Sequence, residues 1–99
     1  MSERSEWQDL RDRRMGEPGA AEAYEHARLA YELGRAVRAL REQKGWSQRD
    51  LADAARMTQP AVARFEAGGT TPTLPVLERL AAALDVDLVV RLDPRSPAA

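Results

Sequence analysis

The sequence predicts a mainly all-α domain with a long first helix and a single β-strand near the C-terminus. Two patterns support this fold class. Between residues 20 and 84, four segments place apolar residues at helical spacing and polar residues where helix ends need caps. Residues 85–93 instead alternate apolar and polar positions for most of their length, as a strand does. The 99 residues leave room for one small domain with a short tail at each end.

The composition excludes several classes of protein. The chain has no cysteine, which rules out disulfides and cysteine-based metal sites. No apolar run approaches the roughly 20 residues that span a bilayer, and the N-terminus is too charged for a signal peptide. We therefore expect a soluble cytoplasmic protein with no membrane partner, no metal and no cofactor.

Charge is distributed unevenly along the chain, although the net charge is only −1. Residues 1–25 carry four basic and seven acidic side chains, and residues 67–99 carry three basic and four acidic ones. Residues 26–66 carry eight basic and five acidic side chains, an excess of three positive charges. A basic middle of this kind can present a positive face to a nucleic acid, or it can be an ordinary solvated surface.

Residues 1–19 are expected to form an N-terminal arm, either as a short helix or without order. Ser5 and Gln8 have the spacing of a capping box, and Pro18 with Gly19 separates the arm from the first long helix. Residues 20–44 then have helix-forming composition throughout, interrupted by Gly34, where we expect a bend or a close contact. The core-facing stripe of this first helix is expected to contain Leu29, Leu33, Ala36, Val37 and Leu40.

Three shorter helices complete the expected domain of residues 20–84. Ser47, Thr58 and Thr73 can each N-cap one of them, and Trp46 is expected to anchor the core before the first. The apolar positions expected to face the core in these helices are Leu51, Ala52, Ala55, Val62, Phe65, Leu74, Leu77, Leu80, Ala81 and Leu84.

The first two of these shorter helices, joined by a brief turn at residues 56–57, have the form of a helix-turn-helix. Both begin with a hydroxyl residue followed by glutamine. A helix N-terminus attracts a DNA phosphate, so Gln48 is expected to hold the backbone, whereas Gln59 can hydrogen-bond N6 and N7 of an adenine in the major groove. The side chains expected to contact DNA are Ser47, Gln48, Arg49, Thr58, Gln59, Pro60, Ala61 and Arg64.

The stretch SQRDLADAARMTQPAVARFEAG, residues 47–68, closely resembles the Cro/repressor-type helix-turn-helix of the xenobiotic-response-element family. With residues 33–84 included, the resemblance covers about half of the chain. It implies a DNA-binding repressor in which Arg41 pairs with Glu66. Arg56 stands where the family usually has Gly, so a slightly altered turn is expected. Pro60 and Ala61 replace polar residues that often read bases, so base contacts would depend on Gln59 and Arg64, with Ala61 against a thymine methyl.

The wider layout is similar to that of HigA-type antitoxins, the DNA-binding partners in host-inhibition-of-growth toxin–antitoxin pairs. This resemblance implies that the protein neutralises a small ribonuclease toxin and autorepresses the shared operon. The acidic balance of residues 1–25 would suit a basic toxin. The expected toxin contacts are large side chains with no evident cover within the chain, namely Trp7, Leu10, Tyr24 and Tyr31.

Residues 85–93 are expected to form a dimerisation strand, because the sequence contains no second strand with which they could pair. Antiparallel pairing with a second copy would bury Val86, Leu88, Val90 and Leu92, and residues 94–99 would be a disordered tail. The same two-fold axis would set two recognition helices about one DNA turn apart, roughly 34 Å, which matches a palindromic operator.

Two other functions are compatible with parts of this pattern, and a third is not. A stand-alone dimeric repressor without a toxin partner would share most of these features. A protein-interaction module that has lost DNA binding would keep the fold. An enzyme is not expected, because the only histidine is His26 and no acid–base cluster accompanies it.

Overall fold

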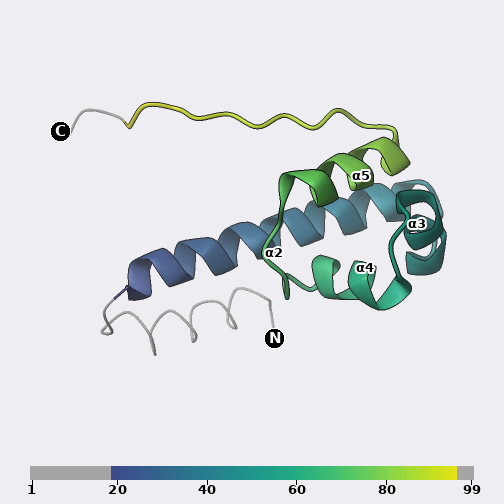
Figure 1. Cartoon of the computed structure of the whole chain (residues 1–99), viewed down its shortest axis with the longest axis horizontal. Helices are drawn as coiled ribbons and strands as arrows, with labels where there is room; N and C mark the ends of the chain where they lie inside the picture. The colour runs from purple at the N-terminus through teal and green to yellow at the C-terminus, as the bar shows by residue number, and fades with distance from the viewer. Residues whose placement is uncertain (1–18, 96–99) are drawn as a thin grey trace.

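A computed structural model describes residues 19–95 of the chain. Within these residues the chain forms four helices (Figure 1), which are α2 (Ala20–Gln43), α3 (Gln48–Ala55), α4 (Gln59–Glu66) and α5 (Leu74–Leu84). Helices α3, α4 and α5 gather around the C-terminal half of α2, while its N-terminal half extends away from them. The expected all-α fold with a long first helix is therefore confirmed.

The three expected N-caps begin the three short helices. Each of Ser47, Thr58 and Thr73 has extended backbone angles, and its side chain accepts a hydrogen bond from the backbone N–H three residues later. Ser47 forms a full capping box, since its own N–H donates to the carboxylate of Asp50 at 2.9 Å. These short-range bonds explain why the helix starts could be predicted from the sequence.

The core lies where α3, α4 and α5 meet the C-terminal half of α2. Its buried side chains are Val37, Leu51, Ala52, Ala55, Val62, Phe65, Leu80 and Leu84, with Leu33, Leu40, Trp46, Met57, Val76, Leu77 and Ala83 packed against them. Leu29, Ala36 and Leu74 were expected in this core, and that prediction is wrong because all three are exposed. Leu29 lies on the projecting half of α2, and Leu74 is the first residue of α5.

Helix α4 approaches α2 closely because two glycines offer no side chain at the contact. A Cβ on Gly34 would overlap the carbonyl oxygen of Phe65 and would lie 2.7 Å from that of Glu66. A Cβ on Gly68, which has a φ of 76°, would lie 2.9 Å from the Cα of Tyr31. The expected close contact at Gly34 is thus present, and it fixes where the end of α4 lies on α2.

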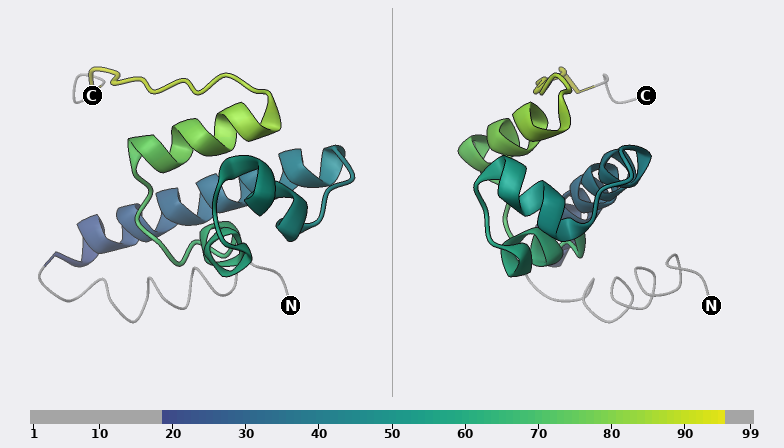
Figure 2. Two further views of the ribbon diagram at one scale, coloured as in Figure 1. Left: turned by 45° about the vertical axis from the view of Figure 1, so that its right-hand side comes forward. Right: turned by 90° about the vertical axis from the view of Figure 1, so that its right-hand side faces the viewer.

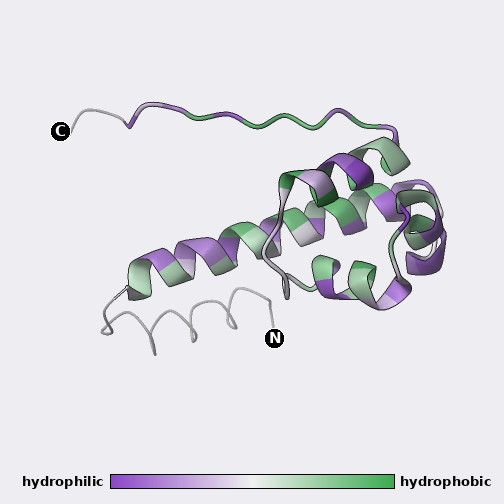
Figure 3. Ribbon diagram, in the orientation of Figure 1, coloured by the Kyte–Doolittle hydropathy of each residue, from purple (hydrophilic) through white to green (hydrophobic). Residues whose placement is uncertain are grey.

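The chain after α5 is extended but belongs to no strand in the single copy, as far as residues 19–95 extend. The segment runs back over α5, on the side of the bundle away from α4 (Figure 2). Hydrophobic and hydrophilic residues alternate along it (Figure 3). The expected strand is therefore absent from this part of the chain, for the physical reason that a strand needs a neighbour to accept its hydrogen bonds.

Candidate nucleic-acid interface

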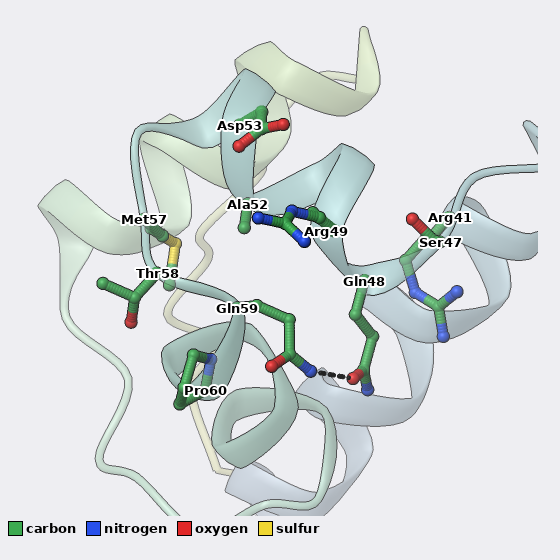
Figure 4. Close-up of a pocket in the computed structure, with 10 residues that line it drawn as sticks. All are labelled: Arg41, Ser47, Gln48, Arg49, Ala52, Asp53, Met57, Thr58, Gln59 and Pro60. Atoms are coloured by element: carbon green, nitrogen blue, oxygen red, sulfur yellow. Dashed lines mark hydrogen bonds between the residues drawn. The ribbon is translucent and has the colours of Figure 1, made fainter.

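An open groove of about 820 Å³ lies between the N-terminal ends of α3 and α4 (Figure 4). Six of the eight side chains expected to contact DNA line this groove, namely Ser47, Gln48, Arg49, Thr58, Gln59 and Pro60. The turn between the two helices brings these side chains together. Ala61 and Arg64 lie further along α4 and are not among the lining residues.

The two glutamines that begin the helices contact each other across the groove. Nε2 of Gln59 donates a hydrogen bond to Oε1 of Gln48 at 2.8 Å, and Figure 4 shows the two side chains pointing toward one another. Nε2 of Gln48 in turn donates to Oε1 of Glu66 at 3.2 Å. The sequence predicted both glutamines as contact residues but gave no sign of this bond between them.

The side chain of Gln48 donates its hydrogen bond to one member of a buried ion pair, Arg41–Glu66. Arg41 donates to Glu66 twice, from Nε to Oε2 at 2.7 Å and from Nη2 to Oε1 at 3.0 Å. Nη1 of Arg41 also donates to the carbonyl oxygen of Trp46 at 2.8 Å, so one guanidinium joins α2, the end of α4 and the loop before α3. The pairing implied by the family resemblance is therefore present, with bidentate geometry that fixes direction as well as distance.

The ion pair keeps both of its members charged in a buried position. Arg41 and Glu66 are each less than a tenth exposed. The pKa of Arg41 is raised above its ordinary value because its guanidinium donates to the Glu66 carboxylate. Removal of either partner would leave the other charge buried without compensation, which is strongly destabilising.

Ser47 and Thr58 have structural roles at the mouth of the groove. The hydroxyl oxygen of Ser47 accepts from the N–H of Asp50 at 3.1 Å, and that of Thr58 accepts from the N–H of Ala61 at 3.2 Å. Each hydroxyl still has a hydrogen to donate to an acceptor outside the protein. Two helix N-termini, each with positive partial charge, therefore open on the same groove.

Four residues that line the groove were not predicted to contact DNA, and one of them is Arg41, which was expected only as the partner of Glu66. Asp53 and Met57 line it together with Ala52. Asp53 lies four residues after Arg49 on α3, and this i, i+4 spacing was the signal that could have placed both on one face. The groove is therefore lined by an acidic side chain as well as by the basic side chains of Arg41 and Arg49.

The residues expected to contact a toxin are only partly within the described chain. Trp7 and Leu10 lie outside residues 19–95. Tyr24 and Tyr31 are half-buried, so they have more cover than the sequence indicated. The guanidinium of Arg35 lies 5.8 Å from the centre of the Tyr31 ring. Nη1 of Arg35 also lies 3.3 Å from the hydroxyl oxygen of Tyr31, so both the ring and the hydroxyl of Tyr31 contact this arginine one turn along α2.

Other kinds of site find little support in residues 19–95. His26 is exposed, and its Nε2 lies 3.3 Å from Oγ1 of Thr71. No group of three acidic, histidine or cysteine side chains in this part of the chain could hold a metal ion. None of the four described helices is long and apolar enough to cross a membrane.

A comparison with protein families gives one match. The family model for helix-turn-helix domains of the Cro/C1 type matches residues 37–90, which is more than half of the chain. The matched region begins within α2, contains both helices of the groove and ends in the extended segment after α5. No curated protein sequence matches the chain.

Proposed function

Because the chain belongs to the helix-turn-helix family of sequence-specific DNA-binding transcription regulators, we propose that it is a dimeric repressor that reads a palindromic operator. In this proposal α4 enters the major groove, α3 lies across the phosphate backbone, and the repressor also acts as the antitoxin of a small ribonuclease. The single observation that carries the DNA-binding part is the hydrogen-bonded pair Gln48 and Gln59 between two helix N-termini.

The bond to Gln48 leaves Gln59 with the groups that an adenine requires. A glutamine amide has two N–H donors and one acceptor oxygen, and the bond to Gln48 uses one donor. The remaining N–H can donate to adenine N7 while the oxygen accepts from adenine N6. Because Glu66 holds Gln48 and Gln48 holds Gln59, the reading amide is oriented before DNA arrives, which reduces the entropy lost on binding.

Phosphate contacts would come from the side chains at the edge of the groove. Arg49 is exposed and has no ion pair within residues 19–95. The N-terminus of α3 adds partial positive charge next to it, and an anion at such a site is stabilised. Arg64, also exposed, lies on α4 further from the groove and would contact the next base or phosphate.

Selection of operators from a random DNA pool tests this part of the proposal. Gln59→Ala is expected to cost about 1–3 kcal/mol on the selected operator and to remove base preference at one position in each half-site. Arg49→Ala should weaken binding to all sequences alike and reduce the salt slope by about one. If Gln59→Ala left the preferred sequence unchanged, α4 would not be the reading helix.

The dimer is supported by the apolar segment that follows α5. The exposed fractions of Val86, Leu88, Val90 and Leu92 in a single copy range from 36% to 96%, and the backbone of residues 87–92 makes no hydrogen bond within residues 19–95. A second copy in antiparallel orientation would supply partners for the backbone hydrogen bonds of this segment. It would also place the apolar side chains over the two α5 helices, where they would be covered.

The antitoxin role is supported by the shape of α2 together with the resemblance to HigA-type antitoxins. The projecting half of α2 is not needed for the helix-turn-helix core, yet it carries Leu29 as a large exposed apolar side chain. We expect this half, which includes Tyr24, to contact the toxin together with the arm that precedes it. A projecting helix with an exposed apolar side chain is a common form of protein-binding surface.

The toxin part predicts that a small ribonuclease is encoded beside this chain, and cleavage of RNA by that neighbouring protein is the readout of the test. Leu29→Asp should weaken inhibition of cleavage but leave operator binding unchanged. Ala36→Asp places the same charge on an exposed position of α2 over the bundle and is the matched control. If the neighbouring protein does not cleave RNA, or if the chain does not inhibit it, the protein is a stand-alone repressor.

A further inference from the structure

The segment after α5 has defined limits. Asp85, with a φ of 58° and a ψ of 45°, caps α5 in the left-handed conformation and cannot be part of a strand. Pro94 lacks an N–H and ends any ladder of hydrogen bonds at the other side. Residues 86–93 are therefore the longest stretch that can pair with another strand.

Exposure of the apolar side chains changes steadily along this segment. Val86 and Leu88 are 37% and 36% exposed, Val90 is 64% exposed and Leu92 is 96% exposed. Val89, on the opposite face, is 78% exposed. The even-numbered face is thus turned toward α5, and its own bundle covers the beginning of that face but not the end.

This gradient predicts how a second copy would fit. An antiparallel partner would place its own Val86, which is 37% exposed, beside the almost fully exposed Leu92 of the first copy. Leu92 would then lie over the α5 of the second copy, and the reverse would hold by symmetry. Each strand would cover its own helix with its first half and the partner's helix with its second half.

We infer that the proposed dimer pairs residues 86–92 about a two-fold axis at Val89, and that Asp87 of each copy selects this register by pairing with Arg91 of the other. The inference rests on the dimer proposed above. Residues directly opposite in an antiparallel pair share a face and interact, so this register makes two Asp87–Arg91 pairs. On the apolar face it places Val86 opposite Leu92 and Leu88 opposite Val90.

The charged side chains are free to make these pairs. Asp87 has no ion pair within residues 19–95, and Arg91 is bound only to Asp93 in its own copy, at 3.2 Å. Both members of that local pair are mostly exposed, so it contributes little and can exchange for the cross-strand contact.

Other positions of the two-fold axis give less favourable cross-strand contacts or fewer paired residues. An axis at Val90 would put Asp87 opposite Asp93 of the second copy and Val86 opposite Pro94. An axis at Leu88 would require Leu84, which belongs to α5, so only residues 86–90 could pair. An axis between two residues would oppose apolar and charged side chains, for example Leu88 and Arg91, and would mix the two faces.

Charge exchange in the full-length chain tests this register. Asp87→Arg alone and Arg91→Asp alone should each raise the dimer dissociation constant about 10- to 100-fold, because two attractive pairs become repulsive. An equimolar mixture of the two variants should form a heterodimer with nearly the wild-type dissociation constant, because both cross-strand pairs are then attractive. The arginine introduced by Asp87→Arg faces the aspartate introduced by Arg91→Asp, and the unchanged Arg91 of the first variant faces the unchanged Asp87 of the second. Native mass spectrometry and sedimentation distinguish the heterodimer from either homodimer.

Glu22→Arg, which makes the same charge change at the far end of α2, is the control and should leave the dimer unchanged. Tighter dimers of Asp87→Arg would indicate the axis at Val90 and overturn the inferred register. A dimer dissociation constant that neither charge change alters would also overturn the inferred register, although the proposed dimer would stand. A wild-type chain that stays monomeric at every concentration would overturn the dimer itself.

Discussion

Arg56 keeps the turn between α3 and α4 in the geometry for which the family usually employs glycine. Its φ of 58° and ψ of 46° are left-handed, and its N–H donates to the carbonyl of Ala52. The positive φ that the sequence marked as uncommon for a residue other than glycine is therefore present at Arg56. A residue with a Cβ pays about 1–2 kcal/mol for this conformation, so the turn holds local strain.

Replacement of Arg56 by Gly should therefore stabilise the protein. We expect the free energy of unfolding to rise by about 0.5–1 kcal/mol, after the greater flexibility of glycine in the unfolded chain is subtracted. Thermal and urea unfolding would measure it. Arg56→Ala removes the same charge but keeps the Cβ and should give no such gain. Equal stability gains in both variants would assign the effect to the side chain instead of the backbone.

Single residues differ in how well the sequence predicts them. Ser47, Thr58 and Thr73 were predicted as caps because a cap bonds to a backbone N–H only three residues away. The contact between Gln48 and Gln59 spans eleven residues, and it forms only after the turn has folded. Its geometry depends on the relative orientation of two helices, which no local pattern encodes.

At the scale of helices, the packing of α4 against α2 depends on a missing side chain. Gly34 faces the carbonyl groups of Phe65 and Glu66 with no space for a Cβ. The same approach carries Glu66 to Arg41 and so sets the position of Gln48. The helix contact thereby controls the geometry of the groove.

Gly34→Ala tests this contact, because the contact determines whether the free energy of unfolding rises or falls. At an open helical position the change would stabilise by about 1 kcal/mol, because alanine is the better helix former. Here we expect a loss of about 1–3 kcal/mol in the free energy of unfolding, because overpacking outweighs that gain. Urea unfolding provides the measurement. A more stable Gly34→Ala protein would show that α4 can move away from α2 without cost.

Helical periodicity predicted most of the core correctly, but it failed in the part of α2 that extends beyond the shorter helices. Val37, Leu51 and Phe65 were assigned to the core correctly because each lies where several helices meet. Leu29 has the same periodicity as Val37, yet it is 52% exposed. Periodicity identifies the apolar face of a helix, but the lengths and positions of the other helices decide how much of that face is covered.

For the whole molecule, dimerisation and operator binding are expected to fail together. Val90→Asp puts a charge on the face that the second copy would bury, and it should give a monomer. Operator affinity should fall to the non-specific range, about 10⁻⁴–10⁻⁶ M at physiological salt. Sedimentation and titration with operator DNA provide the two measurements. Val90→Ile keeps the apolar face and should behave as wild type, whereas a dimeric Val90→Asp protein would place the axis elsewhere.

The uncovered edge of residues 86–92 also determines how such a repressor would respond to its own abundance. Where most chains are single copies, the amount of dimer rises with the square of the chain concentration, so halving the chain lowers the dimer about fourfold. Dilution at cell division or proteolysis of the chain would then open the promoter steeply, with no small-molecule inducer. New synthesis would close it equally steeply, so in such a dimeric repressor the exposed segment would make transcription depend on the concentration of the chain itself.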